Sequence, residues 1–274
     1  MEQLAQCQVN PDPRLPFNCS NGRNLGEQSP TSTWWTSWPL RSSMTPDGTQ
    51  MEECPVIHRQ SSTGEVDSTM AHHSVAIFDL GGVVIDWNPR YLYRKLFNGN
   101  ETAMEYFLSA VCTSSWNEQQ DAGRSFAEGC DSLKRLHPGQ AELIDAWFQR
   151  YEEMLGGEVP GTVDILRELR SRSVPIYALS NWSAETFPVA VNRFECLSWF
   201  NGVLLSGEVR LLKPDRRIFE IFLDTFRIEP SRAIYIDDRS ENVEAAVELG
   251  MCGIVFRDSR ALRAELTRAG LIVD

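Results

Sequence analysis

The sequence lacks long apolar runs and lacks an excess of basic residues. Its longest apolar stretches, such as VAIF and GGVVI, are far shorter than the roughly 20 residues that a membrane-spanning helix needs. Its 26 lysines and arginines stand against 38 aspartates and glutamates, which gives a formal net charge of −12. An acidic chain repels the phosphates of nucleic acids and of anionic membrane surfaces. We therefore expect a protein that binds neither nucleic acid nor membrane.

Paired cysteines and a targeting segment are also missing. The seven cysteines are odd in number and never closer than 12 residues, so neither a disulfide framework nor a zinc site is expected. The N-terminus has no basic segment followed by an apolar core, and it contains acidic residues, which argues against a signal or transit peptide. We expect reduced thiols and a cytoplasmic location.

Residues 1–73 differ in composition from the rest of the chain. They contain 7 prolines, 16 serines and threonines, no lysine and no apolar periodicity. Such a segment buries too little apolar surface to offset its chain entropy, so we predict a disordered tail. Met70 stands just before the first strand-like run, which leads to the hypothesis that native translation starts there.

From residue 74 onward, short β-branched runs alternate with amphipathic helical stretches. Near-continuous apolar runs are typical of buried parallel strands, so the pattern predicts an α/β fold with a Rossmann-like, doubly wound sheet. Residues 90–157 are helical in period and too long for a simple crossover, so we predict a small inserted helical cap, with the core at 74–89 and 158–274. The predicted strands are 74–79, 174–180, 202–206, 233–237 and 253–256.

Polar residues end the predicted strands, where an open parallel sheet binds its ligands. Alone, each is explained as an ordinary turn, cap or surface residue. Together they bring carboxylates, a hydroxyl and a lysine to the strand ends, and the repelling carboxylates indicate a cation between them. In chain order these residues are Asp79 with Gly81 and Gly82, Ser180 with Asn181, Lys213, and Asp237 with Asp238.

The order and the sequences of these segments resemble those of the haloacid dehalogenase-like hydrolase superfamily, whose members are mostly phosphatases, over residues 75–258. FDLGGVVIDW is similar to its first motif, LSNW to its second, KPDRRIF to its third and YIDDRSENVEAAVELGM to its fourth. The DLG wording also resembles a bacterial glucose-1-phosphate phosphatase subgroup. The resemblance implies a Mg²⁺-dependent phosphatase whose partner is a small phosphorylated metabolite, such as a sugar phosphate.

The resemblance also implies roles for the catalytic residues. Asp79 would be the nucleophile that forms an aspartyl-phosphate. Ser180 and the amide of Asn181 would hold the phosphoryl oxygens. Lys213 would neutralise both the phosphate and Asp79, so that an anionic nucleophile can approach an anionic substrate.

A second set of roles concerns the metal and the phosphate. The expected Mg²⁺ ligands are carboxylates and one backbone carbonyl, and glycine amides and one asparagine are expected near the phosphate. In this sequence, the resemblance implies that the metal ligands are Asp79, the carbonyl of Gly81 and Asp238, with Asp237 behind them. It also implies that the phosphate-binding or supporting residues are Gly81, Gly82 and Asn242.

One departure from the family pattern concerns the general acid. Most phosphatases of the superfamily carry a second aspartate two residues after the nucleophile, and here that position is Gly81. Losing general-acid help costs on the order of 10²- to 10⁴-fold in rate. Either the leaving group needs little protonation, or another group such as Asp86 or Glu118 substitutes, or the protein is not a phosphatase.

Two other functions stay open. A 2-haloacid dehalogenase would use Asp79 without a metal, although the acidic pair Asp237 and Asp238 favours a metal site. A non-catalytic protein would keep the site only to bind a phosphorylated ligand or a partner. The leaving group would meet the cap, and the candidate entrance residues are Trp87, Arg90, Tyr91, Trp116, Glu118 and Gln119.

Overall fold

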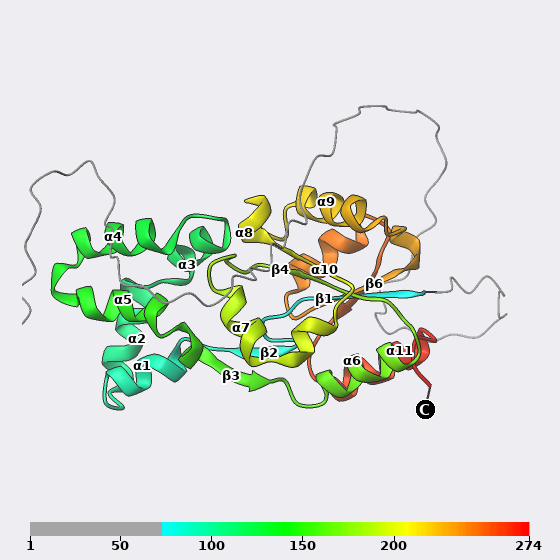
Figure 1. Ribbon diagram of the computed structural model, residues 1–274, viewed down its shortest axis with the longest axis horizontal. Coiled ribbons are helices and arrows are strands. Elements are labelled where there is room, and N and C mark those ends of the chain that lie inside the picture. The colour runs from blue at the N-terminus through cyan, green and yellow to red at the C-terminus, as the bar shows by residue number, and fades with distance from the viewer. Residues whose placement is uncertain (1–72, 274) are drawn as a thin grey trace, which may run out of the picture. The chain divides into compact units, whose positions relative to one another are not determined.

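The computed structural model describes residues 73–273, and a five-stranded parallel sheet forms the centre of this part (Figure 1). Each strand lies within two residues of its predicted range. β1 is the central strand, and the chain adds strands first on one side of it and then on the other, which confirms the α/β, doubly wound prediction. Across the sheet the order is β5 (Gly202–Leu205), β4 (Ile176–Ser180), β1 (Val75–Phe78), β6 (Ala233–Asp237) and β7 (Cys252–Val255).

Helices cover both faces of the sheet, because successive side chains of a buried strand point to opposite faces. In β1, Ala76 and Phe78 belong to one apolar cluster and Ile77 to the other. The first cluster includes apolar side chains of α6 and α11, and the second includes those of α9 and α10. Figure 1 shows α6 and α11 on one side of the sheet and α9 on the other. These helices are α6 (Thr162–Ser171), α9 (Arg216–Phe226), α10 (Ser240–Val247) and α11 (Ser259–Arg268).

A helical segment lies between β1 and α6. It is entered and left through a two-stranded antiparallel ribbon, in which Ile85 of β2 pairs with Glu158 of β3. Side-chain caps start three of its helices, and α4 has a full capping box between Ser125 and Glu128. The division of core and cap at residues 90 and 157 stays a prediction. The elements are β2 (Ile85–Trp87), α1 (Arg90–Leu96), α2 (Glu101–Ala110), α3 (Ser114–Asp121), α4 (Phe126–Leu136), α5 (Ala141–Gln149) and β3 (Leu155–Glu158).

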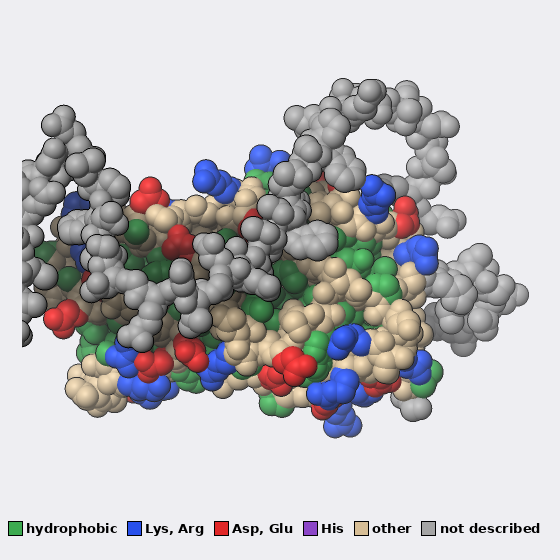
Figure 2. Space-filling view, viewed as in Figure 1, with side chains coloured by type: hydrophobic (Ala, Val, Ile, Leu, Met, Phe, Trp, Pro, Cys, Tyr) green, Lys and Arg blue, Asp and Glu red, His purple; other side chains and the backbone are tan. Residues whose placement is uncertain are grey.

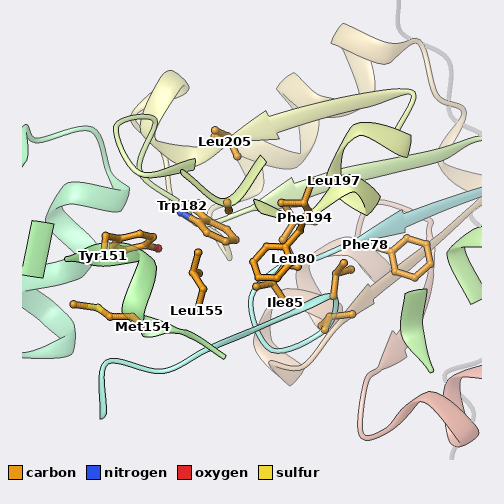
Figure 3. Packing of buried hydrophobic residues seen from close by; sticks show 14 of the residues in the cluster. Phe78, Leu80, Ile85, Tyr151, Met154, Leu155, Trp182, Phe194, Leu197 and Leu205 are labelled. Carbon is orange, nitrogen blue, oxygen red and sulfur yellow. The ribbon is translucent and has the colours of Figure 1, made fainter. Parts of the chain in front are cut away.

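The helical segment and the sheet share one apolar cluster. Figure 3 shows Tyr151 and Met154 on the cap side, with Trp182 between them and residues of the core such as Phe194. The ring centroids of Tyr151 and Trp182 are 6.5 Å apart. Burial of large aromatic side chains on both sides fixes how the cap sits over the sheet.

The visible surface carries charges of both signs. Figure 2 shows lysines and arginines interspersed with aspartates and glutamates over the described part of the visible face. Within residues 73–273, no helix has the length and apolar character to cross a membrane. The predicted tail lies outside the described residues except for residue 73.

The remaining helices of the described residues are short connections between the elements above. They are α7 (Phe187–Arg193), α8 (Ser206–Val209) and the 3-10 helices η1 (Pro138–Gln140), η2 (Tyr151–Met154), η3 (Glu195–Trp199) and η4 (Pro230–Arg232).

Candidate active site

The residues singled out in the sequence meet at the carboxyl ends of the central strands. Asp79 directly follows β1, Ser180 is the last residue of β4, and Asp237 is the last residue of β6. Because β1 lies between β4 and β6, these three chain positions converge at one edge of the sheet. Ser180 is buried, with 1% of its surface exposed.

Lys213 is the cation of the site, and its side chain is only 1% exposed. Its Nζ lies 2.8 Å from Asp79 Oδ1 and 2.7 Å from Asp237 Oδ2, and it donates to the carbonyl oxygen of Leu179 at 2.9 Å. Burial acts to lower the pKa of Lys213, but the two carboxylates outweigh it and raise that pKa. The lysine therefore stays charged in the interior.

The side chain of Asn181 positions the backbone of Lys213. Its Oδ1 accepts from the backbone N–H of Lys213 at 2.9 Å, and its Nδ2 donates to the carbonyl oxygen of Lys213 at 3.1 Å. This pair of hydrogen bonds joins the loop after β4 to the loop before α9. The side-chain amide thus supports the lysine, a contribution that the sequence did not suggest.

Asp79 combines burial with a charged neighbour, since it is 8% exposed and paired with Lys213. Burial raises the pKa of Asp79 to about 6, against the lowering effect of Lys213 and with a further increase from Asp237. A carboxylate with this pKa is a stronger base than an ordinary aspartate and is still largely ionised at neutral pH. These are suitable properties for a nucleophile.

Asp237 is fully buried and lies behind the site, not on the cavity wall. Its carboxylate accepts from Tyr235 Oη at 2.7 Å, from the backbone N–H of Arg239 at 2.9 Å and from Asn242 Nδ2 at 3.0 and 3.1 Å. Burial acts to raise the pKa of Asp237, but Lys213 and these donors hold it below its ordinary value. The structure therefore brings Asn242 to the site through Asp237.

A cluster of three carboxylates can hold a cation. One oxygen each of Asp79, Asp237 and Asp238 lie within 4.8 Å of one another. Burial and the charge of Asp237 raise the pKa of Asp238. Gly82 has φ +77°, and a Cβ there would lie 2.9 Å from Asp238 Oδ2, so the loop after β1 packs closely on this carboxylate. Clustered carboxylate oxygens fit a hard cation such as Mg²⁺.

A cavity of about 380 Å³ opens above these residues. Of the predicted catalytic, phosphate-binding and metal-binding residues, all except Asp237 line it. The cap contributes an apolar wall and several polar side chains. The apolar wall consists of Leu108, Cys112 and Trp147 together with Trp87 and Pro89, which directly precede the predicted cap. The polar cap side chains are Arg90, Ser114, Asn117, Glu118 and Asp121, and the loop after β6 adds Arg239.

The predicted entrance residues divide into two groups. Trp87, Arg90 and Glu118 line the cavity, whereas Tyr91, Trp116 and Gln119 do not. Trp116 is buried in the cap, where its Nε1 donates to a backbone carbonyl. Trp116 therefore packs in the interior of the cap and does not face the substrate cavity.

The proposed substitutes for the missing acid also differ in position. Asp86 does not line the cavity, and its Oδ2 accepts from Tyr91 Oη at 2.6 Å. Glu118 lines the cavity but is exposed. Asp121, at the end of α3, is a second cap carboxyl on the cavity wall, beside Glu118. Sequence reasoning missed it because no strand end or motif marks its position.

Several known proteins are similar to this chain. A family model described as haloacid dehalogenase-like hydrolase matches residues 73–250. A sesquiterpene phosphatase of Aspergillus oryzae is 28% identical over 192 residues, which cover 70% of this chain and 93% of that protein. A phosphorylated carbohydrates phosphatase of Thermotoga maritima is 23% identical over 198 residues, which cover 68% and 88%.

Solved structures share the fold. A HAD family enzyme of Bacteroides thetaiotaomicron, in a magnesium complex, has a TM-score of 0.55 and 22% sequence identity to this chain. The match covers 70% of this chain and 99% of that enzyme.

Proposed function

Because the chain belongs to the haloacid dehalogenase-like hydrolases, as its four motifs predicted, we propose that it is a Mg²⁺-dependent phosphatase that acts through Asp79. The substrate is a small phosphate monoester. The observation that carries this proposal is the buried Lys213, held between Asp79 and Asp237, beside a third carboxylate at Asp238. This arrangement offers a nucleophile, a fixed positive charge and a cation site at one strand edge.

The chemistry follows from the positions of the side chains. A carboxylate oxygen of Asp79 attacks phosphorus, and the bond from phosphorus to the leaving oxygen breaks, which gives an aspartyl-phosphate. Water then attacks phosphorus, breaks its bond to Asp79 and releases phosphate. Lys213 offsets the negative charge on Asp79 and on the phosphoryl group in both steps. The hydroxyl of Ser180 is assigned to a phosphoryl oxygen.

The residues that would hold Mg²⁺ are Asp79, Asp238 and the backbone carbonyl of Gly81. When bound, the ion supplies positive charge to the phosphoryl oxygens. Asp237 has hydrogen-bond donors on both oxygens, so we assign it to holding Lys213 and Asn242 in place behind the ligands. Such outer partners commonly set the affinity of a metal site.

The carboxylate cluster also separates the phosphatase from a dehalogenase. Attack of Asp79 on carbon with loss of halide needs no cation, and two further carboxylates near the nucleophile would only repel it. A phosphoryl group brings its own negative charge and gains from Mg²⁺ and Lys213 together. The relatives named as phosphatases support the same choice.

The cap side of the cavity bears on the leaving group. Trp87, Leu108 and Trp147 offer apolar contacts, and Asn117 and Arg90 offer polar ones. A sugar phosphate uses mainly the polar side chains, whereas an isoprenoid phosphate uses mainly the apolar wall. The relatives named for phosphorylated carbohydrates and for sesquiterpenes represent both classes, so both belong in the substrate panel.

The test uses the full chain with the Asp79→Asn variant beside it. Phosphate release is measured on sugar phosphates, farnesyl phosphate and 2-phosphoglycolate, and chloride release on 2-chloropropionate, each with Mg²⁺ and with chelator. We expect phosphate release that needs both Mg²⁺ and Asp79. Chloride release at the same rate with and without chelator would establish the dehalogenase instead. Binding of a phosphorylated ligand without any turnover would support the non-catalytic alternative.

A further inference from the structure

Asp121 is a carboxyl group of the cap that lies on the wall of the active-site cavity. Besides the main cavity, it lines a side pocket of about 70 Å³ that Gly81 also lines. Gly81 is the position where a second aspartate would stand, and a Cβ there would have no atom within 4 Å. Asp121 therefore lines the same small pocket as Gly81, where no side chain occupies the place of a second aspartate.

Hydrogen bonds hold the Asp121 carboxyl in place. Its Oδ1 accepts from the backbone N–H of Ser183 at 3.0 Å, and its Oδ2 accepts from Asn117 Nδ2 at 2.8 Å. Its carbonyl oxygen accepts from Ser206 Oγ at 2.5 Å, and the same hydroxyl accepts from the backbone N–H of Trp182 at 3.0 Å. The end of α3 is therefore fixed to the loop after β4, beside the predicted phosphate-binding residues.

The surroundings favour the protonated form of this group. Burial raises the pKa of Asp121 to about 8; the N–H of Ser183 acts to lower it and the charge of Glu118 to raise it. Tyr151 is the titratable cap residue beside it. Across the cavity stand the charged groups of the core, which are Asp79, Lys213, Asp238 and Arg239. At neutral pH the carboxyl thus carries a proton that it can donate.

We propose that Asp121 is the general acid of the phosphatase, in the place of the aspartate that is absent at Gly81; this inference rests on the proposed function. When Asp79 attacks phosphorus, the electron pair of the breaking bond stays on the leaving oxygen, which takes the proton of Asp121. The resulting carboxylate keeps its hydrogen bonds from Ser183 and Asn117. In the second step it takes a proton from the attacking water and so returns to its starting state.

Two other carboxyls suit this role less well. Asp86 lies off the cavity and accepts from Tyr91. Glu118 lies on the cavity wall but is exposed, and it does not line the side pocket that Asp121 shares with Gly81. Glu118→Gln is therefore the matched rival variant, three residues away on the same helix.

The experiment compares two substrates in the full chain. 4-Nitrophenyl phosphate has a leaving group that departs without a proton, and an alkyl phosphate has one that needs it. Asp121→Asn keeps the shape and the acceptor for Ser183 but loses the acid. We expect kcat/KM of the variant to fall about 10²-fold on the alkyl phosphate and to change little on the nitrophenyl ester. Adding Gly81→Asp should restore part of the lost activity on the alkyl phosphate.

The contradicting outcomes are distinct. Equal losses on both substrates, or no loss on either, would overturn the role of Asp121, as would the selective loss appearing in Glu118→Gln instead. If Asp121→Asn does not fold, the wild-type pH profile decides: the alkyl reaction should decline above about pH 8 while the nitrophenyl reaction does not, and parallel profiles would overturn the inference. A wild type that releases no phosphate from either ester would overturn the proposed function and this inference with it.

Discussion

The two sides of the cavity are built on opposite electrostatic principles. On the sheet side, each buried charge has a partner, since Lys213 lies within 3 Å of both Asp79 and Asp237. On the cap side, Asp121 has hydrogen-bond donors but no cationic partner among the described residues. Paired groups stay ionised and can bind a phosphoryl group and a metal, whereas an unpaired, partly buried carboxyl keeps its proton. In the proposed mechanism, this difference separates phosphoryl binding from proton donation.

The largest expected effect comes from the sheet side. Asp79→Asn removes the nucleophile, so phosphate release should fall by on the order of 10⁴-fold or more. The matched control is Asp131→Asn, on the exposed surface of α4. Steady-state phosphate release measures both, and circular dichroism verifies the fold. Substantial turnover by Asp79→Asn would mean that another group attacks phosphorus.

Loss of the central cation should affect both activity and stability. Lys213→Met leaves Asp79 and Asp237 buried without their partner, which should cost about 3–5 kcal/mol in the free energy of unfolding. Urea denaturation measures this cost, with Lys134→Met as control, because Lys134 is a partly exposed lysine that also pairs with two carboxylates. A loss below about 1 kcal/mol, the range of surface pairs, would show that the carboxylates do not depend on the lysine.

A smaller effect tests the close approach of the loop after β1 to Asp238. Gly82 and Gly99 both have φ +77°, but only at Gly82 would a Cβ meet a neighbour, Asp238 Oδ2. Both alanine variants share the backbone strain of about 1 kcal/mol or more, so they form a matched pair. Gly82→Ala alone should raise the Mg²⁺ concentration for half-maximal activity, by about 10-fold. An equal increase in Gly99→Ala would contradict this account of the metal site.

The smallest effect compares how the two sides respond to pH. The raised pKa of Asp121, about 8 against 3.8, means that the folded state holds this proton more tightly than the unfolded state. The stability from this group is therefore present at low pH and is lost as pH rises toward about 8. Asp121→Asn should gain Tm over wild type as the pH rises from 5 to 8, because the neutral amide does not lose this stability. A constant difference would show that Asp121 is ionised throughout.

The sheet side could be predicted from sequence because its signals are local. Asp79, Ser180 and Asp237 each end an apolar run, and parallel strands bring their carboxyl ends to one edge. Lys213 follows its predicted strand, just before a proline, but alone it would be explained as a surface lysine, and the resemblance to the family supplied its role. The structure then adds what no pattern contains, such as the support of Lys213 by Asn181.

The cap side could not be predicted in the same way. Which face of α3 meets the cavity depends on how the cap packs on the sheet, and this is set by contacts far apart in sequence, such as Tyr151 with Trp182. The sequence therefore named Asp86 and Glu118 as substitute acids and missed Asp121. Trp87 and Trp116 show the same limit, since the first lines the cavity and the second is buried in the cap.

The most direct test of the central claim is to trap the covalent intermediate. The full chain is mixed with Mg²⁺ and a substrate that it turns over, quenched within milliseconds and reduced with borohydride, which converts an aspartyl-phosphate to homoserine. Peptide mass spectrometry should find homoserine at position 79 in the wild type and none in Asp79→Asn. Homoserine at another position, or phosphate release by Asp79→Asn at the wild-type rate, would contradict the account.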